Sequence, residues 1–170
     1  FVMGASTLTG IALKLPAGRA PGVGFVPVFT LKTARWTVSD DRSKVYGWEA
    51  PAVTDGSIGA DLGALQVPSG QAAQEACWIH TVLNRALDLF SGLSLDIAWW
   101  PSIPIEWPAS GDYFSWGTVC LTKAFQWDVV GHEFGHAIFH FGSDAQGAGG
   151  QHYIDRCYSP TLAWSEGWAS

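Results

Sequence analysis

The sequence predicts an α+β fold, in which a β-rich N-terminal region, residues 1–67, is followed by a region that contains helices, residues 68–170. Before residue 67, short stretches rich in Val, Phe, Thr and Trp are separated by Gly and Pro. After it, apolar residues recur every three or four positions, as expected of helices. The chain has 170 residues, 48% of them hydrophobic and 14% charged, which favours a packed core over a disordered chain.

The N-terminal region is predicted to form strands at residues 7–15, which alternate imperfectly between apolar and polar, and within residues 26–38. Asp40 and Asp41 indicate a turn. We expect a small β-sandwich. Its aromatic residues are either core residues or a platform for stacking against carbohydrate; they are Trp36, Tyr46 and Trp48.

Residues 71–91 predict a core helix, with Ser69 as N-cap and Gly92 as the C-terminal stop. Residues 95–100 indicate a strand that Pro101 ends, and residues 117–122 indicate another. The Pro- and Trp-rich stretch between them is interpreted as a connection.

Charge and composition exclude several classes of protein. The formal net charge is −6 and the nine basic residues are scattered, which argues against a nucleic-acid-binding surface. No apolar run approaches the roughly 18 residues that a membrane span needs. Low charge, few Lys and ten Trp favour a secreted or extracytoplasmic protein. Without a CxxC pair, the three cysteines form either one disulfide with a spare thiol or three free thiols; they are Cys77, Cys120 and Cys157.

The segment Asp128 to Phe141 contains an HExxH motif on a predicted helix, with Asp128 as N-cap and Gly142 as stop. A helix turns by about 100° per residue, so His132 and His136 project from one face, about 6 Å apart along the axis. Two imidazoles at this spacing can bind one zinc ion, and we predict Zn²⁺ as the cofactor.

Glu133 points about 100° away from His132 and is expected to be the general base rather than a ligand. Zinc lowers the pKa of a bound water towards about 7, and a carboxylate completes its deprotonation.

A catalytic zinc ion needs three protein ligands, and Glu166 is the predicted third. Ser159 as N-cap and Pro160 at the first position announce a second helix that carries it. Asp144 and Asp155 are rival ligands. His140, one turn beyond His136, is expected to pack or support rather than to bind.

The motifs HEFGHAI and SEGWAS together resemble the gluzincin metallopeptidases, the superfamily of thermolysin-like and fungalysin-like enzymes. The resemblance covers about residues 70–170. It implies a zincin-like catalytic region with an active-site helix and a second, ligand-bearing helix. It also implies a substrate-binding edge strand just before the motif helix, at Thr118, Val119 and Cys120.

The sequence departs from this family in two ways. Residues 137–165 separate the second His from Glu166, a longer gap than in thermolysin. Within this gap, the insert at residues 142–158 is rich in Gly. Ser170 stands where thermolysin has an Asp that orients a zinc ligand. The resemblance therefore implies a C-terminally incomplete region that needs a further segment or a partner chain. Alternatively, the insert supplies the transition-state stabiliser, from His152, Tyr153 or Tyr158.

Together these features predict zinc-dependent hydrolysis of peptide bonds in a peptide or protein substrate. The alternative is a binding or adhesion module, with or without zinc, that has no catalytic activity.

Overall fold

The computed structural model describes residues 26–52, 67–94, 101–143, 150, 152–153 and 156–170. The predicted strands at 7–15 and 95–100 lie outside these residues. Strands and helices are mixed, which confirms the α+β class. In chain order the elements are β1 (Val28–Thr30), β2 (Trp36–Ser39), β3 (Gly47–Glu49), α1 (Ala72–Gly92), β4 (Ile103–Glu106), β5 (Tyr113–Ser115), β6 (Thr118–Cys120), α2 (Trp127–Gly142) and α3 (Pro160–Ala169).

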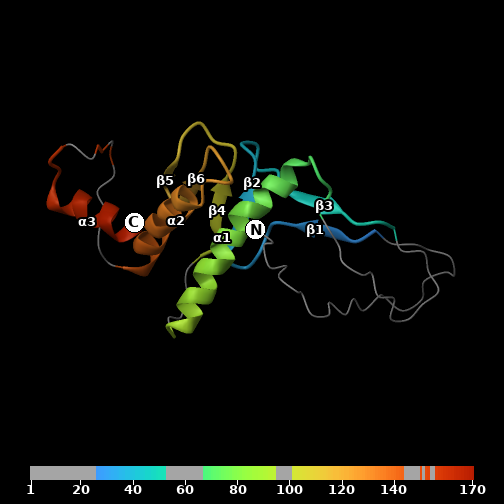
Figure 1. The fold of residues 1–170 in the computed structure, drawn as a ribbon, viewed down its shortest axis with the longest axis horizontal. Coiled ribbons are helices and arrows are strands. Elements are labelled where there is room, and N and C mark those ends of the chain that lie inside the picture. The colour runs from blue at the N-terminus through green and yellow to red at the C-terminus, as the bar shows by residue number, and fades with distance from the viewer. Residues whose placement is uncertain (1–25, 53–66, 95–100, 144–149, 151, 154–155) are drawn as a thin grey trace.

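The main sheet has four strands in the order β2-β4-β6-β5. β2, β4 and β6 are parallel, whereas β5 is antiparallel to β6. β1 and β3 form a separate antiparallel pair. α2 lies between α1 and α3 (Figure 1) and packs against β5 and β6.

The prediction that Thr118, Val119 and Cys120 form an edge strand is wrong. These residues are β6, which pairs with β4 on one side and with β5 on the other. Trp116 and Gly117 have φ values of 51° and 82°, so a two-residue hairpin folds β5 back onto β6. β5 is therefore the border strand on this side of the described sheet, and β2 is the border strand on the other side.

The interpretation of residues 101–116 as a connection is also wrong, because they contain β4 and β5. Pro104 makes β4 hard to predict from sequence, since proline lacks the N–H that a residue of a central strand donates. It is tolerated because the pairing of β4 with β6 begins only at Ile105, one residue later.

The core joins both halves of the chain. Trp36 and Val38 on β2 are buried in the same cluster as Ile79 and Leu83 on α1 and Phe134 on α2. The boundary predicted between residues 67 and 68 therefore does not separate two cores, and β2 belongs to the main sheet.

The N-terminal aromatic residues pack rather than form a platform. Trp36 is 1% exposed, and its Nε1–H donates to His80 Nδ1 at 3.0 Å. The Tyr46 hydroxyl donates to the carbonyl of Trp107 at 2.8 Å, and Trp48 stacks on Phe29.

The helix ends agree only partly with prediction. α3 begins as expected: Ser159 Oγ accepts from the N–H of Leu162, and Pro160 opens the helix. The N-caps expected at Ser69 and Asp128 are each wrong by two residues, since the N-caps are Gln71 and Gln126. Asp128 instead lies in the first turn of α2, where its charge suits the helix dipole. The helices of the described segments include none that is long and apolar enough to cross a membrane.

Candidate metal centre

Three side chains predicted as zinc ligands meet between α2 and α3. Nε2 of His132 lies 3.2 Å from Oε2 of Glu166, and Nε2 of His136 lies 3.4 Å from the same oxygen. The two Nε2 atoms are 3.1 Å apart. Within the described residues these three form a group that could hold a metal ion.

The separations fit a zinc ion. Tetrahedral ligands bound at about 2.0–2.1 Å lie about 3.3 Å from one another. The three measured separations fall on either side of this edge length. Two imidazole nitrogens and one carboxylate oxygen are also ligands that zinc accepts, and three protein ligands leave a fourth position for water or substrate.

Close packing of the two helices brings the carboxylate to the histidines. A Cβ added at Gly135 would lie 2.9 Å from Cα and 3.0 Å from the carbonyl oxygen of Ala169, closer than real Cβ atoms approach backbone. Gly135 therefore lets the backbone of α3 approach α2. Ala169 follows Glu166 by one helical turn, so this contact determines how near Glu166 comes to the histidine pair.

Ser165 contacts His136 at Nδ1, the ring nitrogen that does not face Glu166. Its side-chain oxygen lies 3.4 Å from Nδ1 of His136, and Ser165 is buried. When Nε2 of a histidine binds metal, its Nδ1–H needs an acceptor that fixes the ring. Burial lowers the pKa of His136, and the neighbouring Glu166 carboxylate opposes that shift. The neutral ring that burial favours is the form that binds metal.

Glu133 lies apart from the ligand group and is only 7% exposed. Burial, and then the negative charges of Glu166 and Asp112, raise the pKa of Glu133 from 4.5 to about 7; the backbone N–H of Phe114 donates to it and opposes the shift. A carboxylate with a pKa near neutrality is suited to accept and return a proton. The positive charge of a bound zinc ion would lower this pKa.

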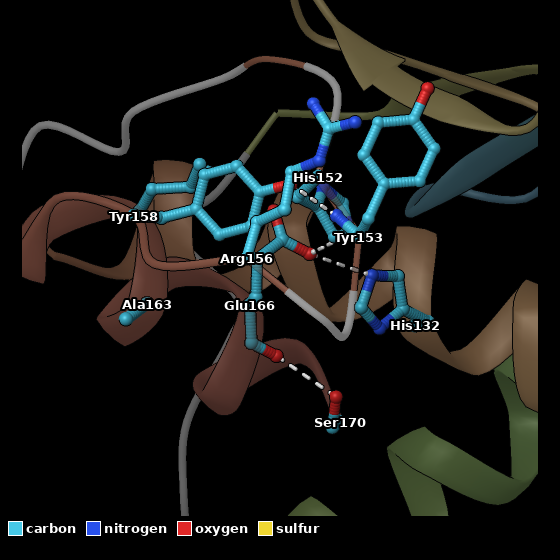
Figure 2. Close-up of a pocket in the computed structure, with 9 residues that line it drawn as sticks. His132, His152, Tyr153, Arg156, Tyr158, Ala163, Glu166 and Ser170 are labelled. Atoms are coloured by element: carbon cyan, nitrogen blue, oxygen red, sulfur yellow. Dashed lines mark hydrogen bonds and ion pairs between the residues drawn. The ribbon is translucent and has the colours of Figure 1, made fainter.

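A pocket of about 330 Å³ opens beside Glu166 (Figure 2). One wall is helical, and the other is the segment formed by the described residues 152–153 and 156–158. This segment brings all three predicted transition-state stabilisers to the pocket. The residues that line it are His132, His152, Tyr153, Arg156, Tyr158, Leu162, Ala163, Glu166 and Ser170.

His152 makes the most direct contact between this segment and the metal centre. Its Nε2 lies 3.1 Å from Oε2 of Glu166, and its Nδ1 lies 3.2 Å from the carbonyl oxygen of Gly150. The two tyrosines support one another, since the backbone N–H of Tyr153 donates to the hydroxyl of Tyr158.

Other predicted residues lie away from the metal centre or outside the described residues. His140 is exposed, and its ring contacts Phe114 at a centroid distance of 5.3 Å, in agreement with the expected packing role. Asp144 and Asp155, the rival ligands, fall outside the described residues. The cysteines are free thiols, on α1, on β6 and after Arg156.

Gly135, Ser165 and Arg156 were not among the residues predicted for the site. The x positions of HExxH carry no ligand, so no local pattern marks a glycine that faces a second helix. Ser165 adjoins the predicted ligand Glu166, which was a usable signal for a supporting group. Arg156 lacks any motif.

Comparisons of the chain with models of protein families, with curated proteins and with solved structures find no match. The functional argument therefore depends on the chemistry and geometry of the described residues.

Proposed function

We propose that this chain is a zinc metallopeptidase of the gluzincin type, secreted or extracytoplasmic, that hydrolyses peptide bonds in peptide or protein substrates. The observation that carries the proposal is the convergence of His132, His136 and Glu166, with separations of 3.1–3.4 Å between their ligand atoms. These separations suit zinc, and the three-ligand set suits a catalytic rather than a structural ion. Zinc bound there supplies Lewis acidity, which lowers the pKa of a coordinated water and polarises the substrate carbonyl.

Glu133 is the residue that moves the proton in this proposal. It follows the first ligand directly, so it projects from α2 in a different direction from the two histidines. The N–H of Phe114 on β5 holds its carboxylate in place, as its effect on the Glu133 pKa indicates. Glu133 accepts a proton from the attacking water and returns it to the leaving amine.

The substrate chain is proposed to lie along β5 rather than β6. β5 packs against α2, and among the described strands it pairs only with β6, so its outer edge is available to an extended peptide. His152, Tyr153 and Tyr158 line the pocket beside Glu166, and their polar groups are proposed to stabilise charge on the carbonyl oxygen.

Glu133→Gln tests the proposal. The zinc-loaded variant should retain one zinc ion per chain and lose at least about 100-fold in the rate of cleavage of a mixed peptide library, since general acid–base catalysis contributes about that much. Glu75→Gln, on the exposed first turn of α1, is the matched control and should cleave like the original chain. Undiminished cleavage by Glu133→Gln, or no cleavage by the zinc-loaded original chain, would contradict the proposal.

One observation favours a second candidate, a zinc-containing binding module without catalysis. His152 presents Nε2 to the ligand oxygen and engages Nδ1 with a carbonyl, which is how a metal-bound histidine is usually supported. A fourth protein ligand would close the metal site, as in structural zinc centres.

X-ray absorption at the zinc edge separates the two candidates. The metallopeptidase requires two histidines in the zinc coordination shell, and the same number in His152→Ala. Three histidines that fall to two in the variant, together with absent cleavage, would establish the closed site instead.

A further inference from the structure

The pocket beside the metal centre contains a permanent positive charge, although the chain is acidic overall. The formal net charge of the chain is −6. The pocket nevertheless contains one permanent cation, Arg156, and two histidines, but a single carboxylate, Glu166. That carboxylate is already engaged by His132, His136 and His152.

Arg156 is held in a defined position. Its guanidinium carbon lies 4.9 Å from the centre of the Tyr153 ring, a cation–π contact, and its backbone N–H donates to the carbonyl of Tyr153 at 3.2 Å. Figure 2 shows the guanidinium of Arg156 beside the ring of Tyr153. Arg156 makes no ion pair with any carboxylate of the described residues. No described carboxylate therefore competes with a ligand for the hydrogen-bond donors of Arg156.

We infer that Arg156 binds a carboxylate group of the substrate while the scissile bond lies at the metal centre, so that this pocket selects substrates that present a carboxylate there. This inference rests on the proposed peptidase function and deepens it. A guanidinium matches a carboxylate through two parallel hydrogen bonds, a geometry that a neutral amide cannot reproduce. The pocket volume of about 330 Å³ suits one or two amino-acid residues rather than a large folded partner.

The carboxylate has two sources in a peptide. A C-terminal carboxylate would make the protein a carboxypeptidase, whereas an Asp or Glu side chain would make it an endopeptidase selective for acidic residues. Both present the same group to Arg156, so the experiment has to separate them.

The test uses three peptide hydroxamates of equal length, since a hydroxamate binds zinc directly. One carries Gln and a free C-terminal acid, one carries Glu and a C-terminal amide, and one carries Gln and an amide. Calorimetry measures their dissociation constants with the zinc-loaded chain, with Arg156→Gln and Arg156→Lys, and with Arg42→Gln, a charge-matched control at an exposed distant position.

At least one acidic probe should bind about tenfold more tightly than the neutral probe to the original chain and to the Arg42→Gln control. The advantage should disappear in Arg156→Gln and be reduced in Arg156→Lys, with zinc content unchanged. Which acidic probe gains identifies the source of the carboxylate.

Equal binding of all three probes to the original chain would overturn the inference and leave the peptidase proposal intact. An advantage that survives Arg156→Gln would overturn it equally. If no hydroxamate binds although zinc is present, the metal site is closed, and the proposed function and this inference both fail.

Discussion

The helical side of the candidate metal centre differs in burial and in its supporting contacts from the segment that faces it, the described residues 152–153 and 156–158. On α2, Glu133 is 7% exposed, and Phe134 and Ala137 are more buried still. Across the pocket, Tyr153 is 52% exposed, and the segment is held by a few polar contacts such as Arg156 over the Tyr153 ring. Packing therefore fixes the ligand geometry, whereas polar contacts shape the pocket. Changes to the helices should affect metal binding and stability together, and changes to the segment should affect recognition alone.

Removing the third ligand should have the largest effect. Glu166→Ala should weaken zinc binding by more than about 100-fold, since the loss of a supporting contact already costs about 10–100-fold. Competition with a fluorescent zinc chelator measures the affinity. Glu75→Ala is the control and should bind zinc normally. Unchanged zinc affinity in Glu166→Ala would show that α3 contributes no ligand to the metal centre.

A methyl group between the two helices should cost both stability and metal. Gly135→Ala forces the backbone of Ala169 away from α2 and should lower the free energy of unfolding by about 1–3 kcal/mol. Its zinc affinity should fall as well, because Glu166 lies on the displaced helix. Denaturant unfolding and the chelator assay give the two readings.

Gly131→Ala on the same helix is the matched control, since nothing lies within 4 Å of an added Cβ there. Alanine is favoured over glycine in a helix by about 0.5–1 kcal/mol, so this variant should be more stable than the original chain. Equal behaviour of the two variants would contradict the role assigned to Gly135.

Removing the support behind His136 should have a smaller effect. Ser165→Ala leaves Nδ1 of His136 without its nearby acceptor and should weaken zinc binding about tenfold. Ser91→Ala, at an exposed position on α1, should leave the affinity unchanged. If Ser165→Ala also binds zinc normally, the 3.4 Å contact has no role in the metal site.

The smallest effect is expected outside the metal centre, at His80. Burial lowers the pKa of His80, and its Nδ1 accepts from Trp36. The folded state therefore prefers neutral His80, and its contribution to stability is present above the unfolded pKa of about 6.5 and is lost as the pH falls below it. His80→Asn keeps an acceptor but does not titrate, so the variant should lose less stability than the original chain between pH 7 and pH 5. Identical slopes in denaturant unfolding would contradict this.

The same contrast explains what the sequence could predict. His132, His136 and Glu133 depend on spacing within one helix, and Glu166 depends on a capped helix that Ser159 and Pro160 announce. Such features are local and can be read from a few consecutive residues. The α+β class likewise follows from local periodicity.

Features that depend on distant contacts were missed or misassigned. Whether Val119 lies at an edge depends on Trp116 and Gly117, whose positive φ values add β5 to the sheet. Pro104 is compatible with a strand only because the pairing of β4 with β6 begins at Ile105, a feature of the sheet that no local pattern shows. The close approach of Gly135 to Ala169 involves two helices separated by the insert, and no local pattern encodes it.

Anomalous diffraction at the zinc edge, from crystals of the zinc-loaded chain, tests the central claim most directly. We predict one strong peak within bonding distance, about 2.0–2.2 Å, of His132 Nε2, His136 Nε2 and Glu166 Oε2. A zinc peak that excludes Glu166, or no peak between α2 and α3, would contradict the account.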